Sequence, residues 1–530
     1  MARAGPPGAR LFAFNRGFAM SIRHHLVAST ALALLAGAAQ AQVTADDVWA
    51  GLVAQYGALG VDQTGTVTRD GAIVTVSGIE GSMMLPMVEG TVLVATGDLL
   101  MTESADGAVD ITLPATWPVT LSIHATDQGE TLAAVADVFV ATQGYAARYL
   151  GTPDDLRATS SYDRMLITLE RLTVALSGEA LPLDVDMLLA LEGAETQSRI
   201  LRQGDVEVQS DGTLARLVVD YSFSIDDMLS HTVSETRDMR YLSRMIVPAG
   251  GFDVLNLAPA LRAGLDLTAS FQSGRLQSQA VSRMGETTIS DTFQTVETAQ
   301  QTLELNADGI AVGGESTGID VQLTLTDLVP GPLGLTLARA AGAFRMPLLA
   351  GQGPAPAGFS LDLAGLALSD GVWDMIGPGT GPLRQLGHLS LDLAAEVTPR
   401  VDLIDLIGLQ ALMDGYDSIP LELNSVTLNS FRAAYAGAEV TGSGAAQLVW
   451  TGLDRLYEVE EPTGSATFVT TGMVGLLDLL SGAGLLGPQE MLGLRGGLAI
   501  VGRPTGVDTL TTDITFGPGI GLVVNGQKLD

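Results

Sequence analysis

Cysteine is absent from the 530-residue chain, and charged residues make up only 16% of it. Without a thiol the chain can form no disulfide, thiolate metal site, cysteine nucleophile or lipid-modified amino-terminal cysteine. Ordinary soluble domains have roughly 25% charged residues and about 7% glycine. The low charge, together with 63 glycines, therefore favours many turns over long charged helices.

Positive charge is the scarcer sign, because 27 Lys and Arg stand against 60 Asp and Glu, and Lys528 is the single lysine. Hydrophobic residues nevertheless reach 46% of the chain. A chain of this length and apolar content can bury a sizeable core in one or more domains. The composition therefore excludes disorder throughout the chain.

A secretory leader is predicted near the start of the sequence. A short basic segment (residues 21–25) follows Met20 and precedes an apolar run (residues 26–39) and the small-residue pattern Ala39-Gln40-Ala41. This three-part order is typical of a signal peptide. A transmembrane anchor is the alternative, but about 14 apolar residues are fewer than the ~20 that cross a bilayer.

We expect cleavage after Ala41, so that residues 1–41 are a signal peptide and residues 1–19 an upstream start or a longer lead-in. Cleavage would leave 23 Lys and Arg against 60 Asp and Glu, a formal net charge of −37. The expected location is the periplasm, with no transmembrane anchor after cleavage. Such a charge opposes binding to nucleic acid and to an anionic membrane surface. The acids are dispersed in pairs such as Asp46-Asp47, which favours a solvated surface.

The first folded element is predicted to be a helix. Thr44 can cap its amino terminus, Asp46 and Asp47 favour its first turn, and apolar residues from Val48 to Tyr56 fall on one face. Beyond Gly60 the hydrophobic period changes to two, which is typical of half-buried strands. The clearest alternating runs are residues 217–225, 265–271 and 319–325.

Turn-forming residues lie between the alternating runs, at residues 210–212, 307–309 and 525–526. The sequence therefore predicts a mainly β fold, with extended antiparallel sheets built from consecutive hairpins and a few flanking helices. One short repeat, Ser-Leu-Asp-Leu-Ala at residues 360–364 and again at 390–394, fits a repeated strand-and-turn unit.

Further helices are predicted at residues 253–263, 402–413, 473–480 and 489–494, although Pro259 would interrupt the first of them. We divide the mature chain into two β-rich halves. They are residues 42–264 and residues 265–530, and the second half contains a helical hairpin near residues 473–497. No Pro/Ser-rich linker separates the halves, so the boundary is weakly marked.

The order of these segments resembles an uncharacterised family of exported proteins, found mainly in alphaproteobacteria and catalogued as domain of unknown function 2125. The segments that carry the resemblance are residues 43–49, 344–347, 368–373, 420–425 with 442–444, and the ending from 508 to 527. The resemblance implies export but no activity, because the family has none assigned, and none of these segments is a chemical signature. The carboxyl-terminal pattern also looks like that of envelope proteins with long, groove-shaped β-sheets.

Two motifs resemble a catalytic and a nucleotide-binding signature. Gly314-Glu315-Ser316-Thr317-Gly318 matches the G-x-S-x-G nucleophile elbow, but that elbow needs a helix after the serine, and an alternating strand follows instead. We interpret it as a turn between strands, and a pairing of Ser316 with His124, His231 or His388 stays open.

Residues 482–487 match G-x-G-x-x-G, yet leucine-rich helical segments flank them and Pro488 suits a first helical turn. A helical hairpin explains this pattern better than dinucleotide binding does. The leucines of the hairpin either pack on a sheet or flank an apolar groove, and their exposure would decide between these two interpretations.

No metal or cofactor site is predicted. The histidines are isolated, and Asn306-Ala307-Asp308-Gly309 lacks the remaining oxygen ligands of a calcium loop, so we interpret it as a turn. Carboxylate pairs for glycoside hydrolysis cannot be selected by sequence because their separation is three-dimensional. The candidates considered were Glu170, Asp184, Asp186 and Glu422.

We therefore assign no catalytic, cofactor-binding or metal-binding residue. The expected function is non-catalytic binding or scaffolding in the envelope, with a possible apolar β groove that holds a lipid or a partner's strand. The expected partners are an envelope lipid or an envelope protein, and no nucleic acid. Two alternatives stay open: a periplasmic hydrolase of envelope glycans or esters that uses Ser316 or carboxylates, and a structural module that binds only protein.

Overall fold

The structure is a computed structural model. It describes residues 43–58, 60–85, 89–127, 130–181, 183–225, 227–326, 331–377, 379–406, 408, 421–450 and 459–529. The predicted signal peptide, residues 1–41, lies outside this part of the chain. The described chain is mainly β, with one large antiparallel sheet of consecutive hairpins and a few helices beside it, so the predicted fold class is confirmed.

The elements up to residue 247 are α3 (Ala45–Ala58), β1 (Asp62–Asp70), β2 (Ile73–Met84), β3 (Glu89–Thr96), β4 (Leu99–Glu103), β5 (Val109–Thr112), β6 (Thr116–Asp127), β7 (Glu130–Gln143), β8 (Ala146–Thr152), β9 (Asp155–Leu176), β10 (Glu179–Ala180), β11 (Asp184–Gln203), β12 (Asp205–Ile225) and β13 (Met228–Val247).

The elements of the middle of the chain are α4 (Ala258–Arg262), β14 (Asp266–Ser273), β15 (Leu276–Met284), β16 (Thr287–Val296), β17 (Thr298–Asn306), β18 (Gly309–Leu325), β19 (Leu333–Met346), β20 (Ala355–Leu368), α5 (Asp370–Ile376), η2 (Gly381–Leu383) and β21 (Gly387–Pro399). The last elements are β22 (Leu421–Tyr435), β23 (Ala438–Trp450), β24 (Val459–Thr471), α7 (Met473–Gly482), α8 (Pro488–Val501), β25 (Arg503–Gly506), β26 (Thr509–Gly517), β27 (Gly521–Val524) and β28 (Gln527–Leu529).

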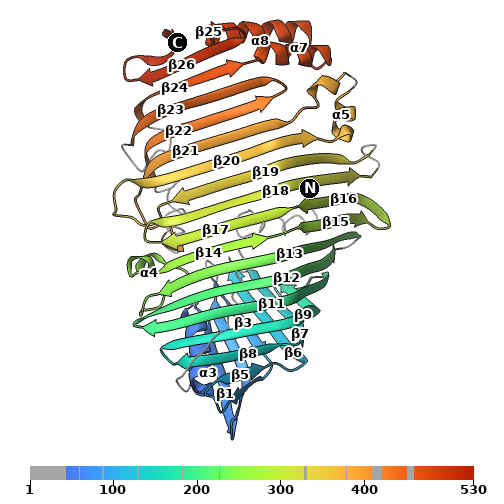
Figure 1. The fold of residues 1–530 in the computed structure, drawn as a ribbon, viewed down its shortest axis with the longest axis vertical. Helices are drawn as coiled ribbons and strands as arrows, with labels where there is room; N and C mark the ends of the chain where they lie inside the picture. Colours follow the sequence, from blue (N-terminus) through green and yellow to red (C-terminus); the bar gives the residue numbers. More distant parts are fainter. Residues whose placement is uncertain are drawn as a thin grey trace, which may run out of the picture.

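Most neighbours in the sheet are also neighbours in sequence. From β18 to β24 each strand pairs antiparallel with the next, and β24 then pairs with β26. At the amino-terminal end β2 pairs with both β3 and β4, and the two branches meet again on β9. Strand β13 pairs with β14 and β15, so the sheet runs without a break across residues 264 and 265. Figure 1 shows the resulting long, continuous sheet.

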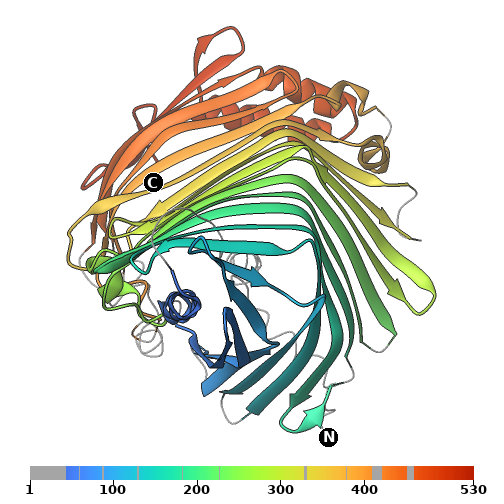
Figure 2. The ribbon, with the colours of Figure 1, turned by 60° about the horizontal axis from the view of Figure 1, so that its bottom comes forward.

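The long strands bend where they cross a common line, which we call the crease (Figure 2). At the crease, residues of neighbouring strands drop out of the pairing register, as Gly193, Ala215 and Asp238 do on β11, β12 and β13. Gly193 has a φ of 64°, and Gly318 on β18 and Gly365 on β20 have φ of 60° and 69°. Glycine adopts such angles without steric cost, and an unpaired residue bends a strand. The crease divides the sheet into two walls.

Helix α3 lies on the concave side of the bent sheet, at the end that carries the first strands (Figure 2). The Thr44 hydroxyl accepts a hydrogen bond from the Asp47 backbone N–H at 3.2 Å, and the Asp47 carboxylate accepts one from the Thr44 backbone N–H at 2.9 Å. This reciprocal cap satisfies donors that a helix start leaves unpaired. It confirms the predicted helix and its cap.

Helices α7 and α8 lie at the opposite end of the sheet (Figure 1). They form the predicted helical hairpin, and the glycines of residues 482–487 join its arms. Helix α7 packs through Leu476, Leu479 and Leu480 against a small cluster around Trp373 and Leu383. Helix α8 extends beyond the predicted residues 489–494.

Two predicted turns are wrong, because both segments lie inside strands. Residues 210–212 lie within β12, where a side chain at Gly212 would overlap the ring of Tyr241 on the neighbouring strand. Glycine is needed there for close packing and not for a turn. Residues 314–318 lie within β18, where Gly318 supplies the bend at the crease. The turns at residues 307–308 and 525–526 are confirmed.

The helix predicted at residues 253–263 is shorter in the structure, since α4 spans only Ala258–Arg262 and Pro259 occupies its first turn. Proline cannot continue an existing helix but suits a helix start, so the helix begins there. The helix predicted at residues 402–413 falls mostly outside the described residues, and residues 403–405 form a turn and a bridge. In the described chain, no helix combines the length and apolar character needed to cross a bilayer.

Candidate functional site

One face of the sheet carries a continuous row of cross-strand neighbours, and we call it the concave face because α3 packs on it. Residues directly opposite each other in an antiparallel pair project from the same face. The row begins with Tyr149, Ala158, Ser198, Ser210, Ser243, Ala269 and Leu303. It continues with Val312, Phe344, Phe359, Leu393, Leu428, Gly444, Ala466, Ile514 and Val524. From Ala269 to Val524, past the three serines, the row carries no polar side chain.

The first strands of the concave face are covered. Helix α3 inserts Val48 and Leu52 among side chains such as Val76, Tyr149 and Leu156. Tyr149 and Leu156 are each only 1% exposed. Burial of this kind is the main favourable term in folding, about 25 cal/mol for each Å² of apolar surface. The main core of the described chain therefore lies under α3.

A second covering segment lies on the edge of one wall. Helix α4 packs Leu261 against Val247 and Leu349, and Met245 and Leu305 of the concave face border this cluster. A polar contact holds α4 to the segment after β21, because Arg262 at the end of α4 forms an ion pair with Asp402 at 2.6 Å. The cover over the concave face thus reaches from α3 to the edge near α4.

Beyond these covers the concave face becomes exposed among the described residues. Val312, Phe344 and Phe359 are successive neighbours in the row, and they are 39%, 41% and 43% exposed. On the other wall, Tyr221 is 39% exposed and Met284 is 58% exposed. Single exposed apolar residues are ordinary, but adjoining ones on one face indicate an interaction surface.

Aromatic rings lie over glycines on this face. A Cβ at Gly442 would overlap the ring of Phe468, and a Cβ at Gly464 would lie 2.6 Å from the ring of Phe516. Phe431 meets Phe468 edge to face at a centroid distance of 6.4 Å. Rings that fill the space above glycines leave few deep, residue-sized pockets in the surface.

A tyrosine cluster lies where the cover by α3 ends. Tyr162 packs with Tyr145 beside Leu191, and the Tyr241 hydroxyl is 2.9 Å from Thr196 Oγ1. Burial raises the pKa of Tyr145 and of Tyr162 because water is excluded from the phenolate form. These phenols therefore stay neutral at physiological pH.

The opposite, convex face carries the charged side chains. Arg216 donates to Glu235 at 2.9 Å, and Arg237 donates to the same carboxylate at 2.5 Å. These two guanidinium groups lower the pKa of Glu235 to about 2. Farther along, His388 lies 2.8 Å from Asp362 and 2.6 Å from Arg432. Ion pairs of this kind keep the convex face solvated and satisfy the carboxylates.

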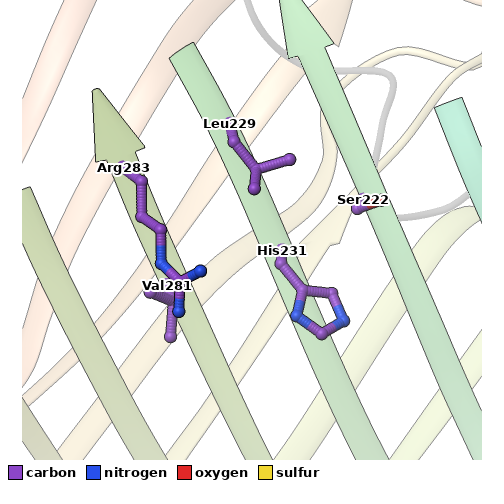
Figure 3. Close-up of a pocket in the computed structure, with 5 residues that line it drawn as sticks. All are labelled: Ser222, Leu229, His231, Val281 and Arg283. Carbon is purple, nitrogen blue, oxygen red and sulfur yellow. The ribbon is translucent and has the colours of Figure 1, made fainter. Parts of the chain in front are cut away.

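Two shallow hollows lie on the convex face. The first, of about 220 Å³, is lined by Ser222, Leu229, His231, Val281 and Arg283 (Figure 3). His231 lies 2.8 Å from Asp220, so its ring already has a carboxylate partner.

The second hollow, of about 450 Å³, lies over β19 to β22 and includes Arg339, Asp362 and His388. Arg339 pairs with Glu315 at 2.9 Å and also with Asp362. His231 in the first hollow, and Arg339, Asp362 and His388 in the second, thus already have charged partners on neighbouring strands.

The structure separates the residues of the considered Ser–His pairing. Ser316 lies opposite Ala299 and Ala340 on the concave face. His231 and His388 lie on the convex face, as their partners Asp220 and Asp362 do. Because the sheet lies between them, neither histidine can take a proton from Ser316. His124 lies on β6, which pairs with β3 and β7 and not with β18.

Three of the four candidate carboxylates lie on the neighbouring strands β9 and β11, and the fourth lies on a distant strand. Glu170 lies on β9, Asp184 and Asp186 lie on β11, and Glu422 forms an ion pair with Arg400 at the start of β22. Asp308 donates its backbone N–H to Asn306 Oδ1 at 2.9 Å, so residues 306–309 form the turn that was expected. No group of three or more metal-binding side chains occurs within the described ranges.

The exposed aromatic residues Phe344 and Phe359 were not singled out from the sequence as a site. Phe344 follows alanine and glycine at residues 340–343, so its strand alternates weakly there, whereas Phe359 follows Gly358 at the start of an alternating run. The cross-strand register, which local sequence does not reveal, brings them together.

Comparison with protein-family models, curated proteins and solved structures finds no match to this chain.

Proposed function

We propose that the chain is an exported, non-catalytic envelope protein whose concave face holds extended apolar chains, such as the acyl chains of a lipid. The observation that carries this proposal is the row that stays apolar after its cover ends, with Val312, Phe344 and Phe359 about two-fifths exposed. An apolar face that the protein's own core does not use is available to an apolar ligand.

The dimensions of the row support an acyl chain as ligand. Seven strand pairings separate β18 from β26. At ~4.8 Å for each pairing the row is about 34 Å long. The hydrocarbon core of a bilayer is ~30 Å thick and holds two chain lengths. One extended acyl chain is therefore shorter than this part of the row.

The chemistry of the row points the same way. Between Leu303 and Val524 its side chains are aliphatic, aromatic or absent, and they offer no hydrogen bond to a polar substrate. A site that discriminates polar ligands needs placed donors and acceptors. A surface without such donors and acceptors, in which aromatic rings fill the space above glycines, suits flexible hydrocarbon of variable length.

The proposal includes the predicted export and the family. The leader at residues 1–41, and the segments that resemble the exported family, support an envelope location. An intact-mass measurement of the protein recovered from the periplasm of a bacterial host tests this part. The expected mass is that of residues 42–530, and a mass that retains residues 1–41 in a cytosolic fraction would contradict it.

The binding proposal is tested by native mass spectrometry of protein purified from the envelope without detergent. Two variants form a matched pair, because Phe344 on the concave face is 41% exposed and Phe139 on the convex face is 40% exposed. We expect lipid-mass adducts on the wild type and on Phe139→Asp. The carboxylate of Phe344→Asp should reduce the adduct at least tenfold, which corresponds to about 1.4 kcal/mol.

Equal loading of the two variants would overturn the concave face as the binding surface. Protein that carries no lipid, but is recovered with a stoichiometric protein partner, would instead establish the scaffolding alternative.

A further inference from the structure

Helix α8 is apolar but has no buried residue. Leu492 is 75% exposed and Ile500 is 72% exposed, and Val507, in the turn before β26, is 99% exposed. Helices in globular proteins gain most of their stability by packing an apolar face. Within the described chain α8 buries no residue fully, so the exposed part of its apolar surface, with Leu492 and Ile500, is available to something outside the chain.

The glycines of α8 strengthen this conclusion. Gly493, Gly496 and Gly497 weaken a helix, yet a Cβ built at any of them meets no atom within 4 Å. The fold of this chain therefore does not require them for close packing. Glycines on an exposed helix instead place no side chain over its backbone, so an external apolar surface can approach the backbone closely.

The charge of this region differs from that of the rest of the chain. Residues 473–507 contain Asp478, Glu490, Arg495 and Arg503 as their only charged residues, two of each sign. Arg495 donates to Asp478 at 2.6 Å, and Arg503 pairs with Asp513 at 2.9 Å. The whole chain has a formal net charge of −33. A neutral, apolar end on an acidic protein suits an uncharged or zwitterionic surface.

The α7–α8 hairpin also lies beside the concave face. Thr512, which faces the same side as Phe468, donates its hydroxyl to the Val501 carbonyl oxygen at 2.9 Å. A Cβ at Gly502 would lie 2.9 Å from Cβ of Leu510 on the same face. The end of α8 is thus anchored to the concave side of β26, at the end of the sheet opposite α3 (Figure 1).

We propose that α8 and Val507 dock into the interfacial layer of a zwitterionic lipid bilayer, and that acyl chains pass there between the bilayer and the concave face. This inference rests on the proposed function. At 14 residues, α8 is about 21 Å long and too short to span a bilayer, so it lies in the interface. The exposed apolar side chains are aliphatic, and neither Trp nor Tyr, which are common at protein interfaces, occurs in α8; its one Arg, Arg495, is paired with Asp478.

Vesicle flotation of the full-length protein tests the docking. The probe is a phosphatidylcholine vesicle, and the variant is Leu492→Asp with Ile500→Asp. The matched control is Val233→Asp with Leu242→Asp, two convex-face residues that are 36% and 42% exposed. We expect the wild type and the control to float with the vesicles. The α8 variant should bind the vesicles at least tenfold more weakly. Far-UV circular dichroism should match in all three proteins.

A second arm replaces part of the phosphatidylcholine with an anionic lipid. Because the chain is acidic, binding should weaken and should recover as salt is raised. Tighter binding to anionic vesicles would overturn the zwitterionic surface. A wild type that does not float, or an α8 variant that changes the oligomeric mass instead of flotation, would overturn the bilayer as occupant and identify a second copy in the latter case.

The docking and the proposed function fail differently. If the wild type carries lipid that Phe344→Asp removes, yet does not float, the docking is wrong and the binding proposal stands. If the wild type floats but Phe344→Asp and Phe139→Asp carry equal lipid, α8 docks and the concave face is not the binding surface.

Discussion

Two positions of one cross-strand row meet very different surroundings. Tyr149, under α3, is 1% exposed, whereas Phe344 in the same row is 41% exposed. Both project from the concave face, and the strands that carry them belong to one sheet. The difference therefore comes from what covers the face and not from the sheet itself.

This contrast assigns different tasks to the two regions. Under α3, apolar side chains form the core that stabilises the fold. From β18 onward the same kind of side chain gains less from folding, because much of its surface still meets water. An exposed apolar surface over many strands lowers the solubility of a protein, and a bound ligand that covers this surface would restore it.

The largest expected effect is on stability at the covered end. Leu156→Ala should lower the free energy of unfolding by about 2–5 kcal/mol, since it leaves a cavity beneath α3. Phe344→Ala in ligand-free protein should cost under about 1.5 kcal/mol, because that ring is already partly hydrated. Urea denaturation of both variants measures the difference. Equal costs would show that the exposed region is as well packed as the region under α3.

A second prediction concerns the boundary between the regions. Gly212→Ala should cost about 1–3 kcal/mol, because the new methyl displaces the Tyr241 ring and breaks its contact with Thr196. The matched change Gly497→Ala on α8 meets no neighbour and should be neutral or stabilising by up to about 1 kcal/mol. Thermal denaturation compares the two. A neutral Gly212→Ala would contradict the close packing of ring over glycine.

The smallest expected effect on stability concerns the convex face, which carries charged side chains in both regions. Arg216 and Arg237 hold the pKa of Glu235 at about 2, below its ordinary value of 4.5. Its stabilising contribution, about 1 kcal/mol, is present above pH 4.5 and is lost as the pH falls toward 2. Glu235→Gln should flatten the pH dependence of unfolding in this window. The exposed Glu286→Gln is the comparison variant, and an equal flattening by both variants would refute the assignment.

The alternation of hydrophobic residues was enough to predict strands such as β12 and the mainly β class. It was not enough to predict the crease. On β12 both Leu214 and Leu217 face the concave side, because Ala215 drops out of register between them. Such a slip interrupts the period of two locally, and local sequence cannot distinguish it from a turn.

The wrong turn at residues 210–212 has a related cause. Its Ser-Asp-Gly composition favours a turn by local preference, but the Tyr241 ring on the next strand requires a residue without a Cβ. The short repeat shows the converse, because its two copies are direct neighbours: Leu361 lies opposite Leu391 in β20 and β21. The sequence revealed the repeated unit, and only the register revealed the apolar row.

Photo-crosslinking in the native envelope tests the central claim most directly. A photoreactive amino acid replaces Val312 on the concave face or Val233 on the convex face, which are 39% and 36% exposed. Because accessibility is matched, the two sites differ mainly in the face they occupy. The account predicts lipid adducts at position 312 at several times the yield at position 233, and equal yields at the two positions would contradict it.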